Sequence, residues 1–333
     1  MKNVCILLIF LLFLPLSLEE IKANDLWRYD LEKAISFSLK EENLSDISEL
    51  AKSLKGATIQ ESAWNILEWE EKNIEYDFDK AQLPEPVIRY WNTGETEIIQ
   101  GKDNIFQLPY ETILRRRGVC KDYTLLTAGL LLETGHSPIF ILDINFLDDP
   151  VGHTATGISV NGWFFVLDQH TPVMDTGTYY KNWLGEDKII DEIILYRIDR
   201  GEELNVTKYR FDTNSFKNAD YRYTSKDPEN ISNQLMIYIR DNFSNLKVNR
   251  DIAYLDKASY LPEGYKRGKT YYYEFPDFLE SYNPIFHYQF MKRLYRDILR
   301  NDKISTDLKG FSYFYMRAEG INDTIRIILN LAS

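Results

Sequence analysis

The sequence contains few of the residues that build covalent cross-links or metal sites. Among its 333 residues there are only two cysteines, Cys5 and Cys120, and four histidines. Two cysteines cannot supply a zinc site of the CxxC…CxxC type, so the sequence excludes that class. Basic residues are also in the minority, since 51 acidic side chains face 39 basic ones and the net charge is −12. Such an acidic chain does not favour a phosphate backbone, and we expect no nucleic-acid partner.

Long apolar runs are scarce, and the clearest one lies at the start of the chain. Residues 4–18 are apolar, follow Lys2 and precede the small residue Ala23. The run is shorter than the ~20 residues that a membrane-spanning helix needs. The pattern predicts a secretory signal peptide over residues 1–23 and a secreted or extracytoplasmic protein. An uncleaved signal anchor, which would attach the protein to a membrane through this segment only, and a buried core helix are the alternatives.

Removal of the signal peptide would leave the mature chain with a single thiol. Cys5 lies in the apolar run, so only Cys120 would remain and no internal disulfide could form. A lone thiol in an exported protein is either a small buried hydrophobic group or a reactive group. The count alone does not separate these two interpretations.

The rest of the chain has the composition of a packed protein, with 44% hydrophobic and 14% aromatic residues. Residues 25–80 have apolar residues at helical spacing, whereas residues 81–108 predict a connecting loop or a short extended segment. We predict an α+β protein with two parts. Residues 24–200 would form a core with N-terminal helices, and residues 201–333 a mixed α/β module of unknown role.

Two helices are expected in the middle of the chain. Pro109 starts a short one that runs to about Arg117 and ends at Gly118. The second begins at Cys120 and runs to about Thr134. Its leucines and alanines make it apolar on most sides, which indicates a buried helix.

Extended segments follow this helix. We predict strands over residues 138–146, 151–160, 163–169 and 189–198. Asn161-Gly162 between the second and the third is a strong signal for a two-residue hairpin turn.

The pattern of apolar and polar residues changes after about residue 200. The pattern predicts helices and strands in alternation, with helices over residues 227–243, 284–300 and 321–331, and strands over residues 271–275 and 311–316. The aromatic segment from Tyr271 to Phe290 is interpreted as core, with a ligand platform as the alternative.

Cys120 occupies a position that suits a nucleophile. At the start of a helix the backbone N–H groups have no partner and the helix dipole is positive. Both effects favour the thiolate, which is the nucleophilic form of cysteine. Backbone N–H groups there can also stabilise an oxyanion.

A cysteine nucleophile needs a base, and four histidines are available. His287 lies in a distant aromatic helix and is interpreted as structural. His136 would be about 24 Å from the start of the Cys120 helix, at 1.5 Å per residue, and is interpreted as part of its C-terminal cap. His153 and His170 remain as candidates for the base.

The hairpin geometry favours His153. With a two-residue turn at Asn161-Gly162, Val160 faces Trp163, His153 faces His170, and Asp168 is diagonal to His153 on the same face. Asp168 can therefore reach the imidazole and orient it as a base requires. His170 could act instead with another orienting group.

The stretch from Leu108 to Pro172 resembles the catalytic core of the transglutaminase-like superfamily. The resemblance rests on Gly118-Val119-Cys120 at a helix start, Gly152-His153-Thr154 at a strand start and Asp168 at the end of the next strand. Together with residues 64–76 it covers roughly residues 60–172. It points to an uncharacterised, possibly archaeal, transglutaminase-like group.

This resemblance implies a fold, a site and a chemistry. It implies a papain-like α+β core with the nucleophile helix packed on an antiparallel sheet, and catalytic roles for Cys120, His153 and Asp168. It implies no organic cofactor, and no EF-hand-type loop in the sequence suggests calcium. The family also uses an upstream side chain to stabilise the oxyanion. The candidates for this donor are Tyr76, Trp91, Gln107 and Tyr110, and the sequence does not separate them.

Three functions remain open at this stage. The first is acyl transfer on amide or carboxamide groups of a protein or peptide substrate through a Cys120 thioester. The second is hydrolysis of the same thioester, as in a cysteine peptidase or amidase, and the third is a non-catalytic binding module.

Overall fold

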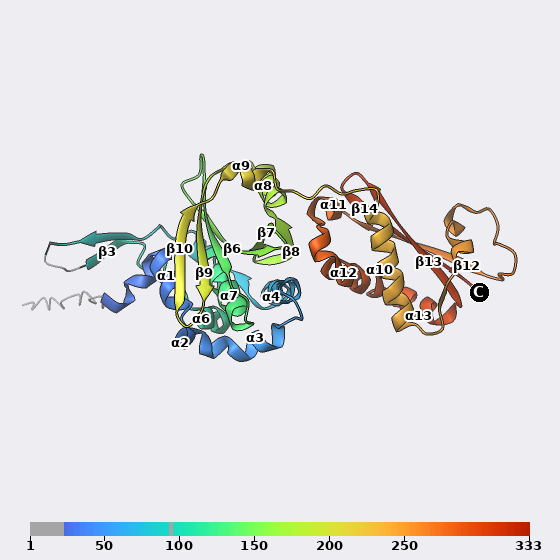
Figure 1. Cartoon of the computed structure of the whole chain (residues 1–333), viewed down its shortest axis with the longest axis horizontal. Coiled ribbons are helices and arrows are strands. Elements are labelled where there is room, and N and C mark those ends of the chain that lie inside the picture. Colours follow the sequence, from blue (N-terminus) through green and yellow to red (C-terminus); the bar gives the residue numbers. More distant parts are fainter. Residues whose placement is uncertain (1–22, 93–95) are drawn as a thin grey trace, which may run out of the picture.

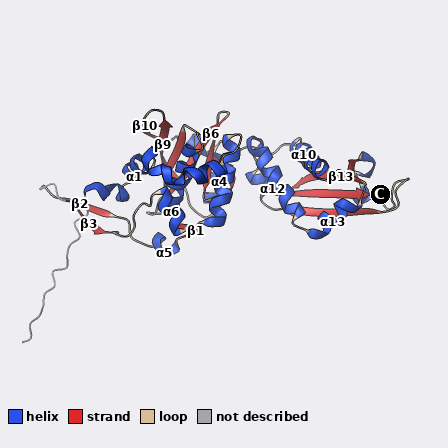
Figure 2. Ribbon diagram, turned by 90° about the horizontal axis from the view of Figure 1, so that it is seen from below, coloured by secondary structure: helices blue, strands red, loops and turns tan. Residues whose placement is uncertain are grey.

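The computed structural model describes residues 23–92 and 96–333 (Figure 1). The predicted signal segment, residues 1–23, therefore lies outside the described residues except for Ala23. Within the described part of the chain, no helix is long and apolar enough to cross a membrane. The chain forms two lobes that lie side by side, and the hairpin of β2 (Val87–Tyr90) and β3 (Thr96–Gln100) projects from the first lobe (Figures 1 and 2).

The first lobe is built on a six-stranded sheet with the strand order β10-β9-β5-β6-β7-β8. All neighbouring strands in it are antiparallel. The strands are β5 (Ile139–Phe146), β6 (His153–Val160), β7 (Trp163–Asp168), β8 (His170–Asp175), β9 (Ile190–Arg200) and β10 (Leu204–Arg210). The four strands predicted in this region are confirmed, and β8 and β10 are additional.

Helices cover both faces of this sheet. On one face lies α7 (Cys120–Glu133), whose leucines share a core with Ile141, Ile158 and Phe165. On the other face, α8 (Thr176–Gly185) and α9 (Thr213–Lys217) share a second core with Leu142 and Val166. The sheet is therefore buried on both sides, and the prediction of a nucleophile helix packed on an antiparallel sheet in an α+β fold is confirmed.

The Asn161-Gly162 turn fixes the register of β6 and β7. Both residues have positive φ, 52° and 82°, as a type I′ turn requires. Val160 pairs with Trp163, and the pairing continues in the predicted register to Thr156 and Leu167.

The N-terminal helices are also confirmed. They are α1 (Leu31–Ser38), α2 (Glu41–Leu44), α3 (Ser48–Leu54) and α4 (Ile59–Asn73), with short 3-10 turns at Ala23–Tyr29 and Ser45–Ile47. The Thr58 side chain accepts a hydrogen bond of 3.2 Å from the N–H of Glu61, which caps α4.

The segment before Cys120 differs from the prediction at one point. Helix α6 (Pro109–Arg115) ends at Arg116, which is left-handed with φ 52°, and not at Gly118. Gly118 instead belongs to β4 (Arg117–Gly118), which pairs in parallel with β1 (Glu75–Tyr76). The pairing of Tyr76 with Gly118 places Tyr76 close to the start of α7. Another short helix, α5 (Phe78–Ala81), follows β1.

The second lobe combines a four-stranded sheet, order β11-β13-β14-β12, with helices (Figure 2). Its strands are β11 (Lys247–Val248), β12 (Gly268–Phe275), β13 (Tyr313–Ile321) and β14 (Thr324–Ala332). Its helices are α10 (Asp227–Asn242), α11 (Phe278–Ser281), α12 (His287–Leu299) and α13 (Asp302–Gly310). Short 3-10 turns lie at Arg250–Ile252, Leu255–Lys257 and Pro284–Phe286. Since β10 pairs with β9, the first lobe extends beyond the predicted boundary at residue 200. Residues 218–226 connect the lobes, and the division into a core and a C-terminal module stays a prediction.

The last predicted helix, over residues 321–331, is wrong. Ile321 ends β13, and the residues from Thr324 onward form β14, which lies between β12 and β13 in the sheet. A central strand is buried on both faces, so it lacks the alternation that would have marked it as a strand. Its isoleucines, which are β-branched, also favour an extended backbone.

Candidate active site

The start of α7 holds Cys120 through a buried acid. Asp122, fully buried in the first turn, accepts hydrogen bonds from the N–H groups of Val119 (3.0 Å) and Gln107 (2.9 Å). Lys80 of α5 forms an ion pair of 2.6 Å with the same carboxylate. Burial of one charge is tolerated here because the partner charge and two N–H donors satisfy it. Three separate segments thus fix the backbone around the cysteine.

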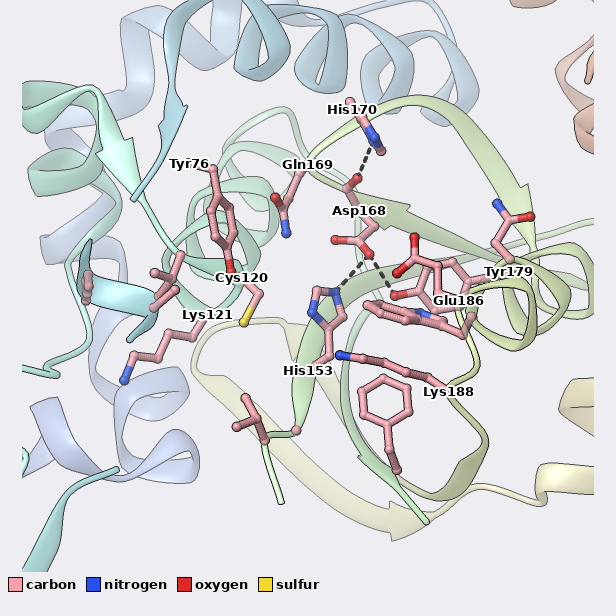
Figure 3. Close-up of a pocket in the computed structure, with 18 of the residues that line it drawn as sticks. Tyr76, Cys120, Lys121, His153, Asp168, Gln169, His170, Tyr179, Glu186 and Lys188 are labelled. Atoms are coloured by element: carbon pink, nitrogen blue, oxygen red, sulfur yellow. Dashed lines mark hydrogen bonds and ion pairs between the residues drawn. The ribbon is translucent and has the colours of Figure 1, made fainter. Parts of the chain in front are cut away.

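His153 and Asp168 lie at the ends of neighbouring strands and contact one another. His153 Nε2 lies 2.8 Å from Asp168 Oδ2, and both side chains are largely buried (Figure 3). His153 is the first residue of β6 and Asp168 the last residue of β7. The diagonal placement expected from the hairpin register therefore brings the two side chains together.

His170 does not face His153, contrary to the expected pairing. Gln169 has φ 63°, so the chain reverses there and His170 begins β8, where it pairs with Asp168. The His170 side chain is exposed, and its Nδ1 lies 3.0 Å from the carbonyl oxygen of Asp168. The Asp168 carboxylate therefore contacts His153 and not His170, the alternative base.

The Cys120 side chain completes this arrangement. Burial by itself would raise the pKa of the Cys120 thiol, but the hydrogen bond and the charge of His153 outweigh burial and lower the pKa below its ordinary value. Hydrogen bonds from the backbone and side chain of Thr154 add to this. Since Nε2 of the imidazole contacts Asp168, Nδ1 is the nitrogen that can contact the Cys120 sulfur.

The imidazole shows the matching shift. Burial alone would lower the pKa of His153, but the negative charge and hydrogen bond of Asp168, together with Cys120, raise it to about 10. Burial would raise the pKa of Asp168, but the charge of His153 keeps it below its usual value. Both shifts favour the thiolate next to an imidazolium more than in the separate groups.

Two aromatic side chains of α8 enclose the pair. The Tyr179 hydroxyl donates a hydrogen bond of 2.7 Å to Asp168 Oδ2. The Trp183 ring packs on the His153 ring with a centroid distance of 4.9 Å. Neither residue was predicted from the sequence. Asp175-Thr176 as an N-cap signal, with aromatic residues at positions 179 and 183 on one helical face, could have indicated this helix.

A cavity of about 400 Å³ opens at these residues (Figure 3). Its walls include Cys120, His153 and Asp168, and also Tyr76 and Trp183. A second hollow of about 280 Å³ shares Cys120 and His153 with the first. Cys120 thus lines both hollows.

The four candidate oxyanion donors have different positions. Tyr76 lines the cavity with Cys120, and burial together with the charge of Cys120 raises the pKa of its hydroxyl to about 12. Gln107 is buried, and within the described part of the chain its side-chain oxygen has no hydrogen-bond partner. Trp91 and Tyr110 are exposed and do not line the cavity. Of the four, the structure brings Tyr76 to the site.

The two remaining histidines lie elsewhere, as predicted. His136 follows the end of α7, and its Nε2 lies 2.9 Å from the Ser62 hydroxyl. His287 belongs to the second lobe, where its Nδ1 lies 2.8 Å from the Tyr282 hydroxyl. Residues 23–92 and 96–333 contain no group of three or more acidic, histidine or cysteine side chains placed to hold a metal ion. The expectation that the reaction needs no cofactor stays a prediction.

Comparison with known proteins relates the chain to a family. The model of a family described as "Transglutaminase-like domain" matches residues 45–196, which include all three side chains of the site. The UPF0252 protein of Archaeoglobus fulgidus is 32% identical over 319 residues, which cover 95% of this chain and 93% of that protein. The chain belongs to this family of archaeal transglutaminase-like proteins.

A second relative matches nearly the whole length of the chain. A UPF0252 protein of Pyrococcus horikoshii is 28% identical over 99% of both chains. Among solved structures, LapG of Legionella pneumophila has a TM-score of 0.26 and 16% identity, and the match covers 45% of this chain and 82% of that one.

Proposed function

We propose that this transglutaminase-like protein catalyses thiol-dependent acyl transfer on amide or carboxamide groups of a protein or peptide substrate. The observation that carries the proposal is the contact of Cys120 with His153, which Asp168 holds at 2.8 Å, at the wall of one cavity. A thiolate that exists at neutral pH beside a proton donor is what acyl transfer through cysteine requires. A non-catalytic binding module does not need this arrangement.

In the first half of the reaction, the Cys120 sulfur attacks the carbonyl carbon of the substrate. A C–S bond forms while the carbonyl π electrons move to oxygen and give an oxyanion. His153 then donates its Nδ1 proton to the leaving amine, the C–N bond breaks and a thioester remains. Asp168 stays charged throughout and keeps the imidazole oriented.

The oxyanion would be stabilised by two donors. The N–H of Cys120 lies in the first turn of α7, where backbone N–H groups have no intrahelical partner. The Tyr76 hydroxyl, whose high pKa keeps it protonated at neutral pH, would be the side-chain donor.

In the second half, an acceptor attacks the thioester and His153 takes its proton. An amine acceptor gives a new amide, as in a transglutaminase, whereas water gives a free acid, as in a peptidase or amidase. Both reactions regenerate the Cys120 thiolate and differ only in the acceptor. Measuring ammonia release, amine incorporation and free acid from a glutamine-containing peptide pool separates transfer from hydrolysis.

Alkylation of Cys120 with iodoacetamide between pH 5 and 9 tests the shared chemistry without a known substrate. We expect fast labelling of the native protein at pH 6 and a loss of roughly 10-fold or more in His153→Ala, because the thiol then returns toward its ordinary pKa. Cys120→Ala is the control for labelling elsewhere. Slow labelling of the native protein that speeds up only on denaturation would favour the binding module and contradict the proposal.

The N-terminal segment supports a proposed location outside the cytoplasm. Lys2, the apolar run over residues 4–18 and the small residue Ala23 have the pattern of a signal peptide. Mass spectrometry of the N-terminus of the protein isolated from its own cells tests this proposal. A mature chain that begins after residue 23 supports cleavage, an intact N-terminus in the membrane fraction supports an anchor, and an intact cytoplasmic protein contradicts both.

A further inference from the structure

The Asp168 carboxylate is held by one residue besides His153. Tyr179, 2% exposed, donates its hydroxyl to Oδ2, the oxygen that also contacts His153. The other oxygen, Oδ1, is buried and has no hydrogen-bond partner among the residues that the structure describes. Two donors on one oxygen are thus the polar contacts that fix how this carboxylate is turned toward the imidazole.

Helix α8, which carries Tyr179, is itself held at its first turn. Asp175, 2% exposed, caps the helix by accepting a hydrogen bond of 3.0 Å from the N–H of Thr178. Its second oxygen accepts hydrogen bonds of 3.0 Å from the N–H of Tyr221 and from the side chain of Asn283. A buried carboxylate with all its contacts satisfied defines one position for the helix.

The contacts at this turn come from the second lobe and the segment that leads to it. Asn283 lies between α11 and α12, and the Thr178 hydroxyl donates a hydrogen bond of 3.1 Å to the carbonyl of Glu280 in α11. The N–H of Gly177 donates to the carbonyl of Ala219 at 3.1 Å. A side chain at Gly177 would meet the N–H of Asp220 at 2.6 Å, so the approach requires glycine.

We infer that Tyr179 is a positioning residue for the Cys120–His153 pair, and that the C-terminal lobe holds the helix that presents it. The inference rests on the proposed thiol chemistry and assigns a role to the second lobe. Hydrogen bonds lead from Asn283 to Asp175 at the start of α8, and from Tyr179 on the same helix to Asp168. Without the Tyr179 hydroxyl, the carboxylate keeps His153 as its single polar contact and can rotate.

The consequence for the sulfur has a defined direction. A carboxylate that rotates fixes the imidazolium less well beside Cys120, and the loss of this contact disfavours the thiolate. The other titratable groups that interact electrostatically with Asp168 come from several elements: Glu70 of α4, Tyr76 of β1, His153 of β6 and His170 of β8.

The test is the pH profile of Cys120 alkylation by iodoacetamide in the full chain. The low-pH limb of this profile is the pH range in which the alkylation rate rises as the thiolate forms. In Tyr179→Phe, which keeps the ring, we expect this limb to move to higher pH by roughly half to one unit. A shift of this size corresponds to the loss of a charge-assisted hydrogen bond that acts on the thiol through one further contact. Tyr180→Phe is the matched control, since Tyr180 lies on the same helix but outside the cavity wall. A limb that stays in place in Tyr179→Phe, or that moves equally in Tyr180→Phe, overturns the inference.

A second pair of variants tests the role of the lobe. Asn283→Ala, and the more conservative Thr178→Val, should move the limb in the same direction as Tyr179→Phe. Asn245→Ala should not, because Asn245 donates to the carbonyls of Leu308 and Phe311 within the second lobe. If Tyr179→Phe moves the limb but neither Asn283→Ala nor Thr178→Val does, the lobe has no such role. If the pH profile of Cys120 alkylation in the wild-type protein is that of an ordinary thiol, it contradicts both the proposed function and this inference.

Discussion

At the scale of single residues, the thiol and the imidazole behave as one unit. Folding lowers the pKa of the Cys120 thiol from its ordinary value of 9.0 and raises the pKa of His153 from 6.5 to about 10. The raised pKa of the imidazole makes the unfolding free energy fall as the pH rises above 6.5, whereas the lowered pKa of the thiol makes it rise with pH below 9.0. The two effects oppose one another, so the pair adds less pH dependence to stability than either group would alone.

Removing the sulfur exposes the contribution of the histidine. In Cys120→Ala, Asp168 still raises the pKa of His153 in the folded protein. The stabilisation that the protonated His153 gives to the fold is therefore complete below pH 6.5, and it is lost as the pH rises through the pKa of His153 in the folded protein. We expect the unfolding free energy of Cys120→Ala, measured by urea denaturation, to fall relative to wild type between pH 6.5 and 9. Parallel curves for the two proteins would mean that no ion pair forms.

Tyr76 offers a second test at this scale. If its hydroxyl stabilises the oxyanion, Tyr76→Phe should lower kcat by roughly 10²–10³ with little change in KM, because the contact exists only after attack on the carbonyl. The rate of Cys120 alkylation, which involves no oxyanion, should change little. An unchanged kcat in Tyr76→Phe would show that the Tyr76 hydroxyl does not stabilise the oxyanion. The backbone N–H donors would then be the remaining candidates.

At the scale of elements, the hairpin turn decides whether the site assembles. A shift of one residue between β6 and β7 would send His153 and Asp168 to opposite faces of the sheet. The type I′ turn at Asn161-Gly162 prevents this shift, because both residues hold left-handed backbone angles that match the twist of the strands.

Substituting the turn glycine measures this constraint. No atom lies within 4 Å of a side chain added at Gly162, so the cost of Gly162→Ala comes from its φ of 82° alone. We expect a loss of about 1–2 kcal/mol in unfolding free energy. Gly185→Ala is the matched control, since this site is equally open and has no positive φ. Equal stability of the two variants would show that the turn does not constrain the hairpin.

At the scale of the whole molecule, the two lobes share one hydrophobic core. Phe286 and Phe290 of the second lobe pack on Trp64 of α4, and Phe286 also contacts Phe165 of β7 at a ring distance of 4.8 Å. Ion pairs such as Lys292–Glu61 surround this contact. A shared core makes separate unfolding of either lobe costly, because it would expose these rings.

We therefore expect a single cooperative thermal transition. Phe286→Ala, at a fully buried ring, should lower the stability of the whole chain by about 3–5 kcal/mol. Tyr288→Ala two residues later, where the ring is 61% exposed, should change it little. Two separate transitions in calorimetry, only one of which moves in Phe286→Ala, would show that the lobes fold independently.

The sequence by itself determined the parts of this protein that depend on local patterns. The Asn161-Gly162 turn and the period of the flanking strands predicted the register, and the register predicted the contact of His153 with Asp168. The break before Cys120 and the apolar run after it predicted the nucleophile helix. These signals are local because turn geometry and helix periodicity arise within a few residues.

Only the tertiary structure decided the rest. The reversal at Gln169 removed His170 from the facing strand, the parallel pairing of Tyr76 with Gly118 selected one oxyanion candidate of four, and burial between two strands made residues 324–332 a strand instead of a helix. Tyr179 reaches Asp168 because α8 folds back over the sheet and the second lobe holds it there. Contacts between segments far apart in the chain depend on packing, which no local pattern of residues encodes.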